Sequence, residues 1–125
     1  MSKIFYDNVG WLLLCAILTV IILWLSLMPG ASAPRGLGWD KLNHAGAIAA
    51  VTFLAFFARR PASRAGLEAF LYGISLGALI EILQGTMTKT RSAEWGDLLA
   101  DLIGAGCIWG LTSVVSRYRK QTCKN

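Results

Sequence analysis

Charged side chains are scarce in this 125-residue chain, since Asp, Glu, Lys and Arg together make up only 15% of it, with seven acids and a single histidine. Hydrophobic residues make up 55%, and the mean hydropathy is +0.55. A water-soluble domain carries a larger share of charged residues, most of them on its surface. The composition therefore excludes an ordinary soluble protein and indicates an integral membrane protein.

Cysteine and proline are also scarce, at three residues each. Cys15 and Cys107 fall inside apolar runs and Cys123 lies near the C-terminus, so the sequence predicts no disulfide framework. The chain also lacks a phosphate-cradling loop, a nucleophile elbow and a redox motif, so no cofactor is expected. It is too short for a second domain, and we expect one domain spanning residues 1–125.

Four apolar runs are each long enough, at about 1.5 Å per helical residue, to cross roughly 30 Å of hydrocarbon. The runs are continuous, whereas the strands of a membrane barrel would alternate polar and apolar residues. The sequence therefore predicts an all-α, polytopic membrane protein with four transmembrane helices in a compact bundle, near Trp11–Met28, Leu42–Ala58, Leu67–Gly85 and Leu98–Val115.

The first apolar run is followed by Ala31-Ser32-Ala33, which resembles a signal-peptide cleavage site. However, the run of about 18 residues is longer than a usual signal core, and Pro34 would hinder the cut. We expect a retained first helix.

Basic residues are distributed unequally between the two ends of these helices. One end carries only Arg35, Lys41, Lys89 and Arg91, and the other carries Lys3, Arg59, Arg60, Arg64, Arg117, Arg119, Lys120 and Lys124. The positive-inside rule then predicts that both termini are cytoplasmic. The net charge of +5 is explained by topology and by contact with anionic lipids, and no nucleic-acid partner is expected.

Polar residues interrupt the apolar runs near one end. On the third run, Gly73, Gly77 and Glu81 follow one another at intervals of four, with Gln84 close to the same stripe. Because small residues let helix backbones approach closely, this stripe is expected to face the other helices. The fourth run repeats the pattern with Asp97, Asp101 and Gly104.

The second run begins with Asp40, Lys41 and His44 on one side of a helix. Because the chain crosses the membrane between runs, this start meets the end of the third run and the start of the fourth at one outward-facing end. Ionisable residues near hydrocarbon cost several kcal/mol unless they are paired, so they are candidates for a functional site.

The predicted site contains two sets of residues. Candidate catalytic residues, suited to moving protons, are Glu81, His44 and Asp97, and candidate substrate-binding residues are Asp40, Lys41, Gln84, Arg91 and Asp101. Asp97 and Asp101 lie one helical turn apart, and two carboxylates that close cannot both ionise cheaply at low dielectric. An acid that keeps its proton for this reason could act as a general acid or base. Lys41 and Arg91 could hold a phosphate or a carboxylate.

Several plainer explanations stay open. Asp40 and Lys41 could cap the second helix, Asp97 could be a first-turn acid, His44 could be an interhelical hydrogen-bonding residue, and Glu81 could form a structural ion pair with Lys41 or Arg91. His44 together with Glu81, Asp97 and Asp101 could also bind a divalent cation such as Mn²⁺, Zn²⁺ or Fe²⁺. No regular metal motif is present, and the basic residues would oppose a cation, so no metal is assigned.

The order Asp40-Lys41-x-x-His44, Glu81-x-x-Gln84, Arg91 and then Asp97 before a small-residue helix with Gly104 resembles the VanZ-like family of small bacterial membrane proteins. The resemblance covers roughly Pro29 to Gly110 and implies a multi-pass protein of the bacterial cytoplasmic membrane. Some relatives are linked to low-level resistance to the glycopeptide teicoplanin. One departure is Asp101, where the family pattern usually has asparagine.

Three functions are compatible with these residues. The chain could be an enzyme acting on a phospholipid or a lipid-linked wall precursor, a non-catalytic protein that binds such a lipid or the glycopeptide itself, or a structural module whose polar network only fixes helix packing. A transporter fits less well, because the polar residues lie near one face and not at the bilayer midplane. The sequence does not fix the oligomeric state.

Overall fold

The computed structural model describes residues 2–28, 39–87 and 94–124, with side chains from residue 8 in the first segment and from residue 41 in the second. These residues form four helices and, within the described ranges, no strand: α1 (Ser2–Ser26), α2 (Trp39–Arg59), α3 (Ala65–Met87) and α4 (Trp95–Thr122). All four helices are long and apolar enough to cross a membrane. The prediction of an all-α bundle with four transmembrane helices is confirmed.

The helix bounds differ from the predicted spans in an informative way. Three helices extend past the predicted residues at both ends, and α4 runs for 28 residues through several basic side chains. Hydropathy detects only the part of a helix that hydrocarbon covers, whereas backbone hydrogen bonding continues into the polar interface. α1 ends at Ser26, two residues before the predicted end at Met28.

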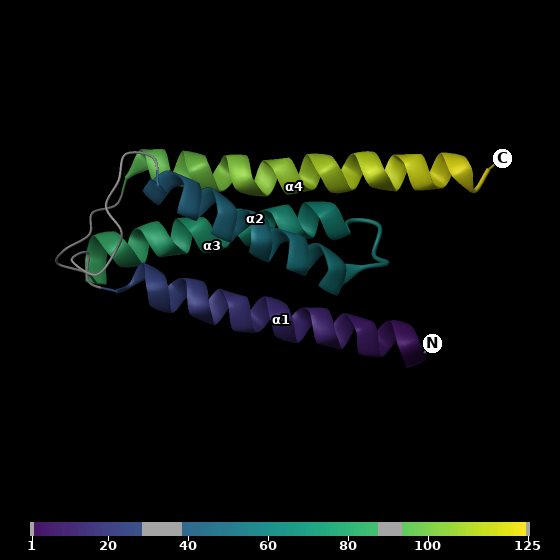
Figure 1. Ribbon diagram of the computed structural model, residues 1–125, viewed down its shortest axis with the longest axis horizontal. Coiled ribbons are helices and arrows are strands. Elements are labelled where there is room, and N and C mark those ends of the chain that lie inside the picture. The colour runs from purple at the N-terminus through teal and green to yellow at the C-terminus, as the bar shows by residue number, and fades with distance from the viewer. Residues whose placement is uncertain (1, 29–38, 88–93, 125) are drawn as a thin grey trace.

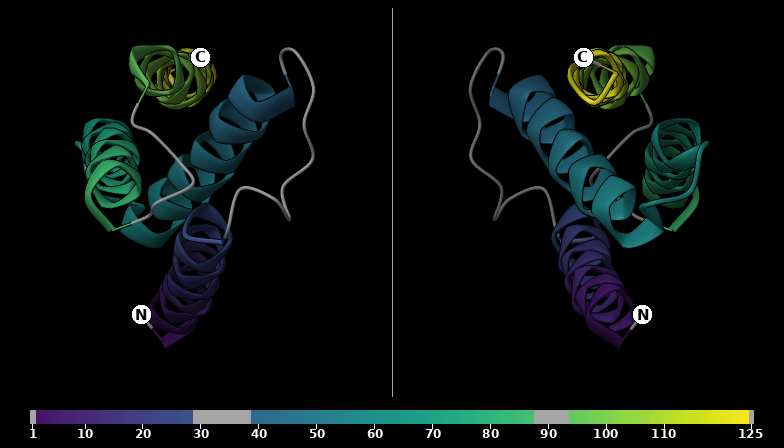
Figure 2. Two further views of the ribbon diagram at one scale, coloured as in Figure 1. Left: turned by 90° about the vertical axis from the view of Figure 1, so that its left-hand side faces the viewer. Right: turned by 90° about the vertical axis from the view of Figure 1, so that its right-hand side faces the viewer.

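The central element is α2, which contacts each of the other three helices, whereas α1 packs mainly on α2 and only narrowly on α3. Figure 2 shows α2 crossing between α1 on one side and the α3–α4 pair on the other. In Figure 1 both chain termini lie at the same end of the bundle as the α2–α3 turn. We call this the terminal end, and the opposite end, where α2 and α4 begin and α1 and α3 finish, the site end.

Close helix contacts depend on small residues, as predicted. A Cβ added at Gly104 would meet the backbone carbonyl of Ala45, and one at Gly73 would meet the hydroxyl of Thr52. These positions hold α4 and α3 against α2. In contrast, a Cβ at Gly110 would have nothing within 4 Å, so this glycine makes no close helix contact.

Most large apolar side chains on the outer faces are exposed in the isolated chain. Leu12, Leu13 and Leu14 on α1 each expose more than half of their surface, and only 11% of this span is buried in the bundle. Such an apolar surface is unfavourable in water and is what a lipid-facing helix requires. The chain thus has the outer surface of a multi-pass membrane protein.

The terminal end is tied together by polar groups. Arg59 pairs with Glu68 across the α2–α3 turn, and the Asn8 side-chain amide donates to the Arg60 carbonyl at 2.6 Å. The Arg60 guanidinium lies 5.4 Å from the ring centroid of Phe57. The Asn8 hydrogen bond joins α1 to the α2–α3 turn, and the Arg59–Glu68 pair joins α2 to α3.

Candidate functional site

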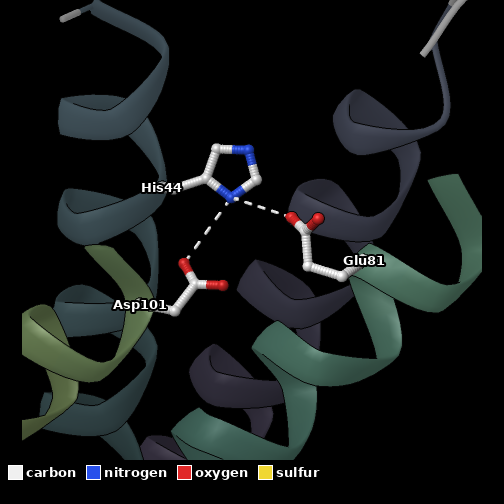
Figure 3. Close-up of side chains that lie close together, drawn as sticks. All are labelled: His44, Glu81 and Asp101. Atoms are coloured by element: carbon white, nitrogen blue, oxygen red, sulfur yellow. Dashed lines mark ion pairs between the residues drawn. The ribbon is translucent and has the colours of Figure 1, made fainter. Parts of the chain in front are cut away.

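The site centres on His44, one turn into α2, whose imidazole is almost fully buried at the site end. Its Nδ1 atom lies 3.5 Å from Asp101 Oδ1 and 3.9 Å from Glu81 Oε1. Figure 3 shows this one ring nitrogen facing both carboxylates, one carried by α3 and one by α4. Three helices therefore supply one histidine and two acids to a single point.

The second ring nitrogen faces another acid. His44 Nε2 lies 3.8 Å from Asp97 Oδ2, and Asp97 is buried in the first turn of α4. The partial positive charge at the N-terminus of a helix stabilises a carboxylate at this position. Asp97 and Asp101 lie one turn apart on the same helix face, so both reach the imidazole from α4.

Glu81 is held in place by the start of α4. Its Oε2 accepts a 2.9 Å hydrogen bond from the backbone N–H of Glu94, the residue that precedes the helix with extended φ and ψ. The N–H groups at a helix start have no partner within the helix, so a carboxylate from α3 satisfies one of them. This bond fixes the end of α3 against the beginning of α4.

Lys41 lies at the edge of the site, with 52% of its side chain exposed. Its Nζ atom is 3.5 Å from Glu94 Oε2 and 3.8 Å from Asp97 Oδ1. The long side chain passes over Gly96, where a Cβ would lie 2.7 Å from Lys41 Cε. Lys41 therefore joins the buried acids to the surface.

Several carboxylate oxygens at the centre are buried without a hydrogen bond. Among the described residues, neither oxygen of Asp101 has a hydrogen-bond partner, and the same is true of Glu81 Oε1. A buried, ionised carboxylate is costly unless other groups compensate its charge. The carboxylates of Asp101 and Glu81 therefore need a proton or a nearby cation to compensate their negative charge.

The structure brings together five of the eight predicted residues: His44, Glu81, Asp97, Asp101 and Lys41. Gln84 is buried one turn beyond Glu81, and its side-chain amide donates to the Ser26 carbonyl at 3.0 Å, which ties α3 to the end of α1. The side chain of Asp40 and the whole of Arg91 lie outside the described residues.

The alternative in which Glu81 pairs with Lys41 does not hold among the described residues. Lys41 pairs with Glu94 and Asp97, and the ion-pair neighbour of Glu81 is His44. The reason is position along α2, because Lys41 lies about one turn before His44 and therefore closer to solvent.

Sequence reasoning missed Glu94 and Thr52. Glu94 supplies both a backbone donor for Glu81 and a carboxylate for Lys41. An acid directly before an apolar helix is a recognisable start signal and could have indicated it. Thr52, fully buried against Gly73 two turns below His44, gives no such signal, because an isolated threonine in an apolar run is common.

Comparison of this chain with models of known protein families, with curated proteins and with solved structures found no match. The VanZ-like resemblance stays a prediction from the residues quoted above.

Proposed function

We propose that this chain is a VanZ-like protein of the bacterial cytoplasmic membrane whose outward-facing polar site binds, or acts on, the anionic headgroup of a lipid or a lipid-linked wall component. Through this site it would contribute to teicoplanin resistance. The observation that carries the proposal is the cluster itself, in which a buried histidine meets three carboxylates at one end of an apolar bundle. Such groups are costly near hydrocarbon, and a fold that needed only stability would replace them with apolar residues.

The position of Lys41 favours a headgroup as the ligand. Its side chain is half exposed where the buried cluster meets the surface, and its ammonium group lies within 4 Å of two acids. A lipid beside the bundle would have its acyl chains against the exposed apolar helix faces and its headgroup near this cation. The proposed site thus fits an amphiphile better than a fully water-soluble ligand.

The same proposal gives three residues of the site a role in catalysis. Glu81, His44 and Asp97 are the groups that a headgroup would meet behind Lys41, and they are the residues that would exchange protons with it. Mass spectrometry of lipids from membranes with and without the protein decides this point. A lipid species converted by the wild type and not by Glu81→Gln would support catalysis, and identical lipid profiles would remove it in favour of binding.

The experiment that tests the function is teicoplanin susceptibility of cells expressing the wild type, Glu81→Gln or Asp97→Asn at matched membrane levels. We expect the wild type to protect and both variants to lose protection, because each loses a charge at the cluster with little change in shape. Glu68→Gln is the matched control, since it removes an acid from α3 at the terminal end. If the wild type behaves like an empty vector, the proposed resistance is wrong.

A second candidate, the structural module, is favoured by one contact. A Cβ at Gly77 would lie 2.5 Å from Asp101 Oδ2 and 2.9 Å from Asp101 Cβ, so this acid is also a close-packed part of the α3–α4 interface. If the network only fixes packing, Glu81→Gln should lower stability while a folded sample keeps full protection. Loss of protection with unchanged stability would exclude this candidate.

A further inference from the structure

Three possible metal ligands from three helices converge at the site. One ligand atom from each of His44, Glu81 and Asp101 lies within 4.8 Å of the other two, and His44 Nδ1 faces both carboxylates. We propose that His44, Glu81 and Asp101 bind a divalent transition-metal ion, Zn²⁺ or Mn²⁺. Figure 3 shows the three groups pointing toward a common centre.

The distances suit a shared cation better than direct hydrogen bonds. The separations of 3.5 and 3.9 Å from His44 Nδ1 exceed the usual hydrogen-bond range of about 2.7–3.2 Å. Two ligands of a tetrahedral zinc ion, each about 2.0–2.2 Å from the metal, are separated by roughly 3.4 Å. Small side-chain rotations would bring all three groups to that spacing.

Burial supplies an independent reason. The Asp101 side chain is only 1% exposed and the Glu81 side chain 9% exposed, and the oxygens that face the centre have no hydrogen-bond partner among the described residues. A single Nδ1 proton could serve only one of the two carboxylates. A divalent cation would compensate both at once.

The surrounding groups fit a metal-bound histidine. A ligating histidine usually places its other ring nitrogen against a carboxylate, which fixes the tautomer and the ring orientation. Asp97 occupies this position beside Nε2 at 3.8 Å, and the Glu94 N–H orients Glu81 in a similar way.

The ammonium group of Lys41 does not oppose a cation here. It lies against Glu94 and Asp97, which are outside the proposed ligand set, and not against the three proposed ligands. The objection that Lys41 would repel a metal is therefore weaker.

The ligand set indicates both the metal class and its use. One imidazole nitrogen with two carboxylate oxygens suits Zn²⁺ or Mn²⁺, and three protein ligands leave at least one coordination position open. An anionic phosphate or carboxylate oxygen could occupy that position, beside Lys41, and with His44 and Glu81 holding the metal, Asp97 would be the group left to exchange protons with it. This last step rests on the proposed function, whereas the metal site itself rests on the geometry.

The test uses the full chain purified in detergent, stripped with a chelator and reloaded separately with ZnCl₂ or MnCl₂. After desalting, elemental mass spectrometry should find one ion per chain for at least one of the two metals. With Mn²⁺, pulsed electron paramagnetic resonance should detect coupling to an imidazole nitrogen. Failure of the wild type to retain either metal would overturn the proposal.

Variants locate the site. Asp101→Asn, Glu81→Gln and His44→Gln should each weaken metal affinity by at least about tenfold, and His44→Gln should abolish the nitrogen coupling. Asp97→Asn should weaken affinity by about 10–100-fold through the imidazole. Glu68→Gln, which removes an acid from α3 at the terminal end, should bind as the wild type does. Circular dichroism and gel filtration identify any variant that fails to fold, and affinities unchanged in the folded ligand variants would contradict the proposal.

The two proposals can fail separately. A metal-binding protein without effect on lipids or susceptibility would leave the metal site and remove the function. If Glu81→Gln loses protection and the wild type retains no metal, the proposed function stands and the metal site is wrong.

Discussion

Asp101 illustrates how one residue serves both packing and chemistry. Its carboxylate fills the space left by the missing side chain of Gly77 on α3 and places one oxygen 3.5 Å from His44. A neutral asparagine at this position would have nearly the same shape without the charge. The acid here therefore adds negative charge to a site that already contains Glu81 and Asp97.

The first prediction at this scale is that Gly77→Ala destabilises the protein by about 1–3 kcal/mol, because the added methyl group would overlap the Asp101 carboxylate. The measurement is unfolding in mixed micelles with increasing SDS, followed by circular dichroism. Gly110→Ala is the matched control, since a Cβ there meets nothing within 4 Å. Equal stability of the two variants would show that the α3–α4 contact is looser than described.

Among the helices, α1 depends on α2 for its place in the bundle. Its contact with α3 is narrow, and its buried residues include Cys15, whose thiol faces the Val51 carbonyl at 3.8 Å. Most of its remaining surface is left to lipid. The position of α1 is thus fixed chiefly by the α1–α2 interface.

Thiol labelling tests this interface. In detergent, a charged maleimide should modify the exposed Cys123 rapidly and the buried Cys15 only after SDS unfolding. Cys107 is exposed on a lipid-facing part of α4, so an apolar maleimide should reach it more readily than a charged one. Intact-mass and peptide mass spectrometry give the order of labelling. Native labelling of Cys15 at the rate of Cys123 would mean that α1 separates from α2.

For the whole molecule, the main feature is the separation of its two ends. The terminal end carries both termini and most of the basic residues, and the site end carries the histidine–carboxylate cluster. Four membrane crossings place both termini on one side, because an even number returns the chain to the side on which it began. Orientation then decides which compartment the site faces.

Reporter fusions test that orientation. From the positive-inside rule we expect green fluorescent protein to fluoresce when fused to either terminus and alkaline phosphatase to be inactive at both. Phosphatase joined after residue 37, between α1 and α2, should be active. Activity at both termini would place the site on the cytoplasmic side, and unlike results at the two termini would contradict the even number of crossings.

The sequence determined the number of spans, the stripes of small residues and which polar residues lie near one end of the helices. Hydrophobicity and helical periodicity are local properties, so the burial of Glu81, Gln84 and Asp97 could be predicted from spacing alone. The unequal distribution of basic residues between the two ends can likewise be read directly from the sequence.

Only the tertiary structure decided which groups meet. Helix rotation and crossing place Glu81 and Asp101 at one nitrogen of His44 and Asp97 at the other, and they direct Lys41 to Glu94. They also make α2 the central helix. The physical reason is that contacts between helices depend on how three separate helix faces pack together, which no local pattern in a single helix contains.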